Sequence, residues 1–232
     1  MAPADGGTQD KLNVSISMGS LEAVRKSCEE GADVNQGCQH TGWLPVHSAA
    51  SGGSEAILSF LVEKKASVSA ATKRSVQPVH LVAKEGHVRV LQKLLSLKAD
   101  IEAKTLTKKR PIHFACEEAH ADLVRLLIGA GCDPLTPDRD NCSPYDYARL
   151  AIAAGAPGSE SVVAMLQEVG CAHGGGGIQE YDPNDMIIHG IVSQVGDEVN
   201  NPGTWWWDPA ARRATQQPRP AGHEHPNLPK QP

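Results

Sequence analysis

The sequence has few aromatic residues, no strong excess of either charge and no long hydrophobic run. Phe, Trp and Tyr make up 4% of its 232 residues, and the formal net charge is −5 at pH 7. A nucleic-acid-binding domain is usually strongly basic, so this composition argues against one. No apolar stretch approaches the roughly 20 residues that a membrane helix needs, and residues 1–5 lack the charged and apolar parts of a signal peptide. We therefore expect neither a membrane nor a nucleic acid as partner.

The cysteines follow no metal-binding or redox pattern. None of the six belongs to a C-x-x-C pair or to a zinc-finger spacing. Reduced thiols buried as small hydrophobic groups are the simplest interpretation, which places the protein inside the cell. The expected compartment is the cytoplasm, with cytoskeletal, ciliary and nuclear assemblies left open. The residues are Cys28, Cys38, Cys116, Cys132, Cys142 and Cys171.

Catalytic motifs are also missing from the sequence. It contains no nucleophile elbow, P-loop, dinucleotide fingerprint or zinc-protease helix. An enzyme would have to use acids and bases such as Asp182, Asp185 and His189, in a C-terminal segment too short for a credible core. His223 and His225 provide two ligands where a structural zinc site needs four. We predict no catalytic residue, no metal, no cofactor and no small-molecule substrate.

A repeat with a period of 33 residues is the strongest signal in the chain. Prolines stand at Pro45, Pro78, Pro111 and Pro144, and the first three are followed two residues later by His47, His80 and His113. Proline suits the first turn of a helix, because the N–H that it lacks would have no partner there. A second helical stretch in each unit has apolar residues in an i, i+1, i+4 pattern, as in Ile57, Leu58 and Leu61.

Each second helical stretch closes on a short motif of small residues, such as Gly31-Ala32-Asp33-Val34-Asn35. A glycine at a helix C-terminus adopts the left-handed conformation that satisfies the last carbonyl groups. The alternation in Asp33-Val34-Asn35 predicts an extended arm after it. With these motifs the sequence resembles ankyrin repeats, whose pattern T-P-L-H-x-A has a period of 33. The resemblance covers roughly residues 8–173.

The resemblance implies an all-α solenoid of stacked helix-turn-helix units with short extended arms and an irregular C-terminal tail. Residues 1–10 are expected to form an N-terminal arm and residues 174–232 a Gly/Pro-rich tail. It also implies that the recurring histidines bind neighbouring backbone and are structural, as are the four prolines. The expected units are 11–35, 36–69, 70–102, 103–135 and 136–173.

Three departures from the family pattern stand out. The turn glycine survives only as Gly42, and Ser75, Lys108 and Asn141 replace it, which predicts strained or variant turns. Asp146 replaces the histidine in the last unit. Six extra residues separate the two helices of that unit near 153–158, as expected of a terminal repeat that exposes one face.

Partners of ankyrin repeats usually contact the arms and the first helices on the concave side, so the resemblance implies a protein partner there. Lys73-Arg74 and Lys108-Lys109-Arg110 add positive charge, which favours an acidic partner surface. A merely solvated set of charges is the alternative. The candidate positions in the repeats are His40, Thr41, Trp43, Lys73, Arg74, Val76, Lys84, Glu85, Lys109, Glu117, Glu118 and Arg139.

Trp43 is the only tryptophan in the repeats and lies two residues before the first proline of the series. An outward ring there would be a candidate hot spot, since tryptophan is enriched among residues that dominate binding energy. The alternative is that the ring covers the end of the stack.

The tail begins with Gly174-Gly175-Gly176-Gly177, a flexible linker, and holds half of the 16 prolines. An apolar stretch covers Met186–Val192, and Trp205, Trp206 and Trp207 follow. Three consecutive indoles are costly to leave in water, so we expect a docking role for them. The tail would either fold back on the repeats or bind another protein.

Together these features predict a non-catalytic interaction scaffold or adaptor within a multi-protein assembly. The alternative is a regulatory subunit whose tail inserts into a partner enzyme.

Overall fold

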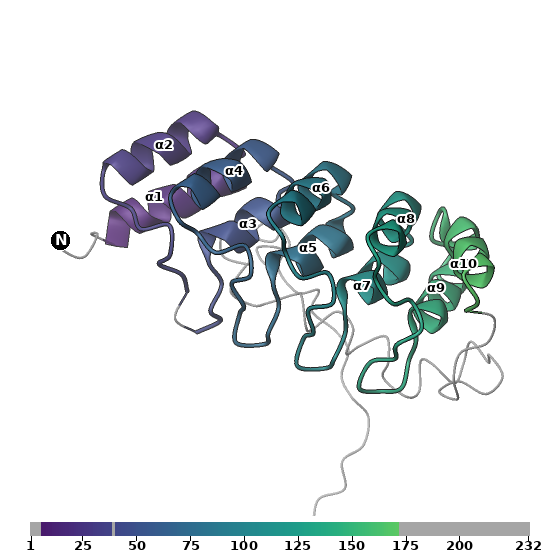
Figure 1. Ribbon diagram of the computed structural model, residues 1–232. Helices are drawn as coiled ribbons and strands as arrows, with labels where there is room; N and C mark the ends of the chain where they lie inside the picture. Colours follow the sequence, from purple (N-terminus) through teal and green to yellow (C-terminus); the bar gives the residue numbers. More distant parts are fainter. Residues whose placement is uncertain (1–5, 39, 172–232) are drawn as a thin grey trace, which may run out of the picture.

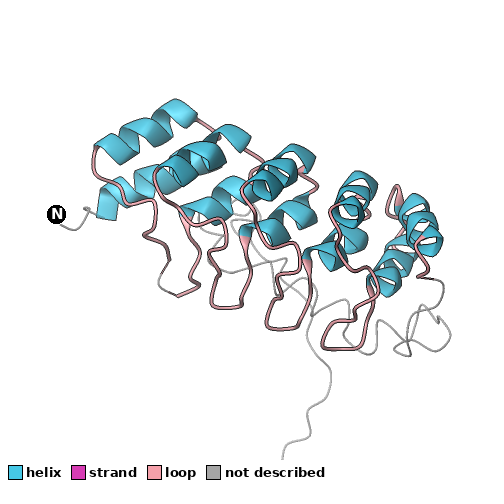
Figure 2. Ribbon diagram, viewed as in Figure 1, coloured by secondary structure: helices cyan, strands magenta, loops and turns pink. Residues whose placement is uncertain are grey.

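The computed structural model describes residues 6–38 and 40–171 as a row of helix pairs. One layer holds the first helix of each unit and the other holds the second, and the hairpin-like arms project from one side (Figures 1 and 2). The predicted all-α stack is confirmed, and no strand occurs among these residues. The first helices are α1 (Gly6–Ser17), α3 (Pro45–Ser51), α5 (Pro78–Glu85), α7 (Pro111–Glu117) and α9 (Pro144–Ala153). The second helices are α2 (Leu21–Glu29), α4 (Glu55–Glu63), α6 (Val88–Ser96), α8 (Ala121–Gly129) and α10 (Ser159–Glu168).

The helices begin where the sequence supplies a start signal. Proline occupies the first position of α3, α5, α7 and α9. Ser20 and Ser54 cap α2 and α4, because their side chains accept hydrogen bonds from Ala23 N and Ile57 N. These signals fix the phase of each helix, and hence which face turns toward the neighbouring unit.

The core is a set of columns that run through the stack. The three apolar columns of the second helices are almost completely buried in α4, α6 and α8. Complete burial of such a side chain contributes about 1.5–3 kcal/mol. Because each column continues from one unit to the next, no unit has a core of its own. The columns are Ile57, Val90 and Leu123; Leu58, Leu91 and Val124; and Leu61, Leu94 and Leu127.

The first unit begins earlier than the sequence predicts. Helix α1 starts at Gly6, inside the segment 1–10 that was expected to be an arm. Gln9 is buried, and its amide nitrogen donates to the carbonyls of Asp33 and Gln36 at 3.1 and 3.0 Å. Its amide oxygen accepts from Asp33 N at 3.2 Å. Gln9 thereby fastens the first helix to the end of its own unit.

The predicted extended arm at Asp33-Val34-Asn35 is wrong. Asp33 Oδ1 accepts from Asn35 N at 2.8 Å, and the chain turns there. The same turn recurs where Glu102 N donates to Asp100 Oδ1 and Leu135 N donates to Asp133 Oδ1, each at 2.9 Å. An aspartate bonded to backbone two residues later stabilises a turn better than an extended chain.

The last unit takes up its extra residues in three places. Helix α9 has ten residues where α7 has seven, and α10 has ten where α8 has nine. The connection 154–158 is longer than the connection 118–120 of the preceding unit. Asp146 takes the place of the histidine, because its Oδ2 accepts from Ser143 N at 2.8 Å and from Ser143 Oγ at 2.7 Å.

Candidate protein-binding surface

The arms are tight hairpin loops joined to one another by backbone hydrogen bonds. Within each arm a hydrogen bond closes the loop, as from Thr72 N to Val76 O at 2.9 Å. Between arms the bonds run from Lys73 N to Thr41 O, from Leu106 N to Arg74 O and from Arg139 N to Thr107 O, at 3.0, 3.1 and 2.7 Å. The tips therefore form one continuous surface. We call residues 40–42, 72–75, 105–108 and 138–141 the arm-tip surface.

The exposed charges of the arm-tip surface are mostly positive. Lys73, Arg74, Lys108 and Arg139 are exposed, and Asp140 is the single exposed acidic side chain among these tip residues. Leu106 stands among them with 61% of its surface exposed. The chain as a whole carries a net charge of −5, so the sign of this surface is opposite to that of the molecule.

The remaining sequence-predicted positions lie on the arms and first helices beside these tips. His40 is exposed and Thr41 is half-buried. Glu85 and Glu118 are exposed at the ends of α5 and α7, and Lys84 is half-buried. Trp205, Trp206 and Trp207 lie outside the described residues.

The column two residues before each proline does not belong to the exposed surface. Trp43, Val76, Lys109 and Cys142 occupy it, and each has at most 9% of its surface exposed. In so tight a hairpin, alternate side chains point in opposite directions, and this column points toward the first helices. The prediction that Trp43, Val76 and Lys109 face a partner is therefore wrong. Apolar residues at positions 76 and 142 were the sequence signal for burial.

Trp43 packs against its own unit. Its indole Nε1 donates to Ser48 Oγ at 2.9 Å, and its ring centroid lies 5.4 Å from that of His47. The ring does not project outward as expected of a hot spot. Its burial in the first arm of the row favours the alternative interpretation, a ring that covers the end of the stack.

Lys109 is a buried cation in this otherwise uncharged column. Its ammonium nitrogen lies 3.6 Å from Glu117 Oε2 and 4.5 Å from the centre of the Tyr147 ring. A cation over an aromatic face is attracted by the ring quadrupole. Burial raises the pKa of Glu117 to about 7, although the nearby ammonium of Lys109 opposes this shift. Lys109 and Glu117 thus bind each other rather than a partner.

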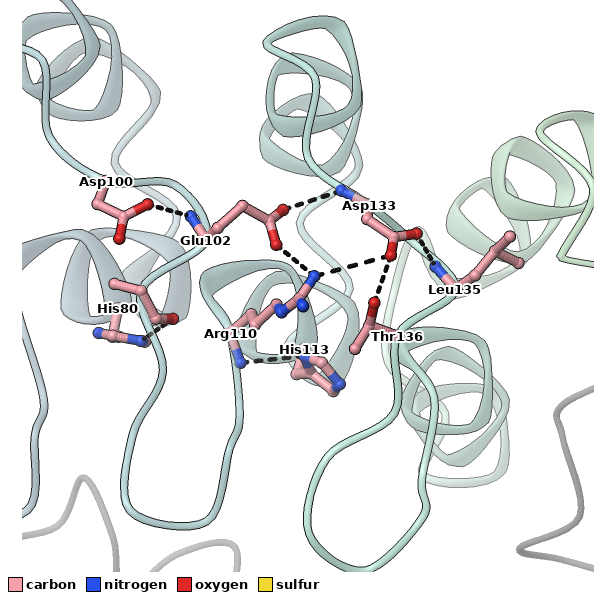
Figure 3. A network of polar contacts seen from close by, with 9 residues as sticks. His80, Asp100, Glu102, Arg110, His113, Asp133, Leu135 and Thr136 are labelled. Atoms are coloured by element: carbon pink, nitrogen blue, oxygen red, sulfur yellow. Dashed lines mark hydrogen bonds and ion pairs between the residues drawn. The ribbon is translucent and has the colours of Figure 1, made fainter.

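Arg110 is the second predicted arm cation that the structure buries. Its guanidinium forms an ion pair with Glu102 and lies 3.9 Å from Asp133 Oδ2. Glu102 Oε1 also accepts from Asp133 N at 2.9 Å, so three charged side chains join consecutive units (Figure 3). Of the run Lys108-Lys109-Arg110, only Lys108 remains available at the surface.

Each recurring histidine binds the backbone of its own arm, and His47 and His80 also connect that arm to the next. The Nδ1 atoms of His47, His80 and His113 accept from the backbone N–H three residues earlier, at 3.0–3.1 Å. Because an N–H only donates, each neutral ring carries its proton on Nε2. His47 Nε2 donates to Ala70 O at 3.1 Å, and His80 Nε2 donates to Ala103 O at 3.0 Å.

Burial keeps these histidines neutral. It lowers the pKa of His47 and His80 to about 4 and that of His113 to about 3, where the charges of Lys109 and Arg110 add to the effect. An unfolded histidine titrates near 6.5. Below that pH the unfolded chain therefore binds more protons than the folded chain, and each histidine destabilises the fold as pH falls from 6.5 toward 4.

We expect the repeat stack to be less stable at pH 5 than at pH 7. The three histidines together would remove more stability than Glu117 restores, since Glu117 has a raised pKa and gains stability on protonation between pH 7 and 4.5. The net loss is on the order of 3 kcal/mol. Urea unfolding at pH 7, 6 and 5 measures it. An unfolding free energy that is constant across this range would contradict the assignment of neutral buried histidines.

Two further recurring histidines were not identified from the sequence. His87 and His120 precede α6 and α8, 33 residues apart, and their Nε2 atoms contact the carbonyls of Ser51 and Lys84 in the preceding units at 2.7 and 2.8 Å. Each ring lies over a glycine of the preceding unit, where a Cβ at Gly53 or Gly86 would approach the ring to 2.6 and 2.8 Å. The 33-residue spacing was the signal that could have identified them.

The turns that lack glycine keep the geometry of the glycine turn. Ser75, Lys108 and Asn141 have φ of 58°, 63° and 61°, close to the 72° of Gly42. A residue with a side chain costs about 1–2 kcal/mol in this left-handed region. The predicted strain is therefore present at the arm-tip surface, and the neighbouring arms hold it in place through their shared hydrogen bonds.

The described part of the chain contains no cluster of His, Cys, Asp and Glu that could hold a metal ion. Within the same residues, no helix is long and apolar enough to cross a membrane. All six cysteines fall in residues 6–38 and 40–171, and each is a free thiol.

The structure is a helical solenoid, in which helix pairs repeat every 33 residues and an arm joins each unit to the next. The exposed arms present one continuous surface. The family described as ankyrin repeats (3 copies) matches residues 12–105, and that described as ankyrin repeats (many copies) matches residues 97–148. The chain belongs to the ankyrin-repeat family. Ankyrin repeats generally mediate protein–protein interaction and are typically non-catalytic modules. A search of curated proteins found no significant match.

Proposed function

We propose that this protein is an adaptor that binds an acidic segment of a protein partner on its arm-tip surface. The observation that carries the proposal is the set of four exposed cations on three consecutive arms, Lys73, Arg74, Lys108 and Arg139. Charges of one sign on adjacent arms attract a partner of the opposite sign and exclude partners of the same sign. Leu106 at their centre offers an apolar contact to the same partner.

The arms present these charges on a preformed surface. Backbone hydrogen bonds between the tips hold neighbouring arms together, so little conformational freedom is lost on binding. Glu85 and Glu118 lie on the first helices beside the arms. They limit the positive region to the tips and favour a partner segment that runs along the row of arms.

Charge reversal tests the proposal. The variant Lys73→Glu, Lys108→Glu, Arg139→Glu is expected to weaken partner binding about tenfold or more. It removes three charge contacts of up to about 1 kcal/mol each and adds repulsion between like charges. Affinity purification from cells, with quantitative mass spectrometry, identifies the partner, and titration with the purified partner measures the change.

The matched control carries the same change of charge on the second helices. Lys26, Arg89 and Arg125 are exposed on α2, α6 and α8, away from the arms. The control Lys26→Glu, Arg89→Glu, Arg125→Glu should bind nearly as well as the unchanged chain. Equal losses in both variants, or binding that is insensitive to salt between 50 and 500 mM, a range that screens exposed charges, would contradict the proposal.

A further inference from the structure

We infer that the arm-tip surface is occupied by residues 178–208 of this same chain, which dock on it in cis. The inference extends the proposed function, because a segment of the chain would then compete with the external partner for one surface. The docking itself does not require that a partner exists. The charge of the segment, the chemistry of the surface and the point where the chain leaves the repeats support this docking.

The segment is acidic, whereas the exposed charges of the arm-tip surface are mostly positive. Residues 172–211 contain six acidic side chains and no lysine or arginine. The next basic residues, Arg212 and Arg213, follow directly after this stretch. The acidic residues are Glu180, Asp182, Asp185, Asp197, Glu198 and Asp208.

The apolar residues of the segment also match the surface. Met186–Val192 lies between the two groups of acidic residues, and Trp205–Trp207 precedes Asp208. Leu106 is exposed between arms that carry Arg74 and Arg139. Indole rings bind both apolar side chains and guanidinium or ammonium groups, the latter through cation–π contacts. A segment that alternates acidic and apolar stretches therefore complements both features of the arm-tip surface.

The chain leaves the repeats on the side of the arms. Cys171 N donates to Leu166 O at 2.9 Å, as Ala99 N and Cys132 N donate to Leu94 O and Leu127 O, each at 3.0 Å. After Ala99 and Cys132 the chain enters the next arm. Cys171 thus stands where another arm would start.

The linker is long enough for the docking. Residues 172–177 include four consecutive glycines, and a Gly-rich chain of six residues spans about 12–15 Å on average. Packed helices of neighbouring units lie about 8–10 Å apart. The arm of the fifth unit is therefore within reach of residue 178, and the rest of the segment extends toward the fourth and third.

Carbodiimide cross-linking of the full-length protein tests this directly. The reagent joins a lysine amine to a carboxylate only when the two are in contact. Peptide mass spectrometry is expected to find tail carboxylates linked to Lys73 and Lys108. Lys26 and Lys93, on the second helices α2 and α6, should yield at most about a tenth as many such links. Similar yields at all four lysines would overturn the inference.

An equal mixture of unlabelled and ¹⁵N-labelled protein identifies the chain that supplies the carboxylate. Links within one isotope class at dilute protein support docking in cis. Links that mix the two classes in statistical proportion would mean that a second copy occupies the surface, and would overturn the inference.

Neutralising the tail separates this inference from the proposed function. The variant Asp182→Asn, Asp185→Asn, Asp197→Asn, Glu198→Gln retains Glu180 and Asp208 as reporting carboxylates. These should link to Lys73 and Lys108 several-fold less often, and an acidic partner should bind about tenfold more tightly, because the free surface is more populated. Unchanged links from Glu180 and Asp208 would overturn the cis docking. Loss of these links without any charge-dependent partner binding would instead leave the docking standing and contradict the proposed function.

Discussion

Replacing His80 by alanine is expected to lower the free energy of unfolding by about 3–4 kcal/mol. The substitution removes the acceptor of Gln77 N and the donor to Ala103 O, both of which are held in the interior of the stack. It also leaves a cavity beside the Phe114 ring, whose centroid lies 5.7 Å from that of His80. Unsatisfied buried polar groups cost about 1–3 kcal/mol each, and a cavity of this size adds to the loss.

The consequence for the stack goes beyond one unit, because His80 connects the arm before α5 to the arm before α7. Urea unfolding followed by far-UV circular dichroism measures the loss. His40→Ala, at an exposed position of the first arm, serves as the control and should change stability by less than about 0.5 kcal/mol. A loss below about 1 kcal/mol for His80→Ala would contradict the structural role of this ring.

Replacing Lys109 by methionine is expected to destabilise the protein by about 3 kcal/mol at pH 8 and by much less at pH 6. At pH 8 the substitution leaves the carboxylate of Glu117 without its ion-pair partner in a largely buried site. Breaking a buried pair in this way costs about 3–5 kcal/mol. The pKa of Glu117 is already raised to about 7, so at pH 6 the group takes up a proton and the uncompensated charge disappears.

The double variant Lys109→Met, Glu117→Gln separates charge from packing. It removes both charges together, and its stability should lie within about 1 kcal/mol of the unchanged chain at either pH, since replacing a buried ion pair is often neutral. Guanidinium would screen the pair, so urea is the suitable denaturant. A single variant whose loss is the same at pH 6 and pH 8 would show that Lys109 acts through shape alone.

The repeat architecture could be predicted from the sequence because it depends on local rules that recur. Proline at the start of a helix and apolar columns at the helical period need no knowledge of neighbouring units. The side-chain direction in the arms could not be predicted in the same way. Lys109 has a charged side chain, and only the hairpin geometry of the arm directs it inward onto Glu117 and Tyr147.

The contacts between units were harder to predict than the units themselves. Arg110 was assigned to a partner because of its charge, whereas Glu102 and Asp133 of consecutive units bind it. His87 and His120 lie outside the T-P-L-H motif, so the family pattern gave no reason to single them out. The contacts that these side chains make depend on distances across the stack, which the order of residues along the chain does not specify.

The last interface of the stack has fewer polar contacts than the two interfaces before it. His113 Nε2 has no hydrogen-bond partner among the described residues, and Ala153 stands where the 33-residue spacing would put a third residue after His87 and His120. In a one-dimensional array, opening begins at the boundary with the weakest coupling. The fifth unit should therefore open before the third and fourth, and its amide protons should exchange with deuterium sooner than those of α5 and α6. Residues 172–232 are attached to the fifth unit. Each opening of this unit would therefore move their point of attachment away from the other four units.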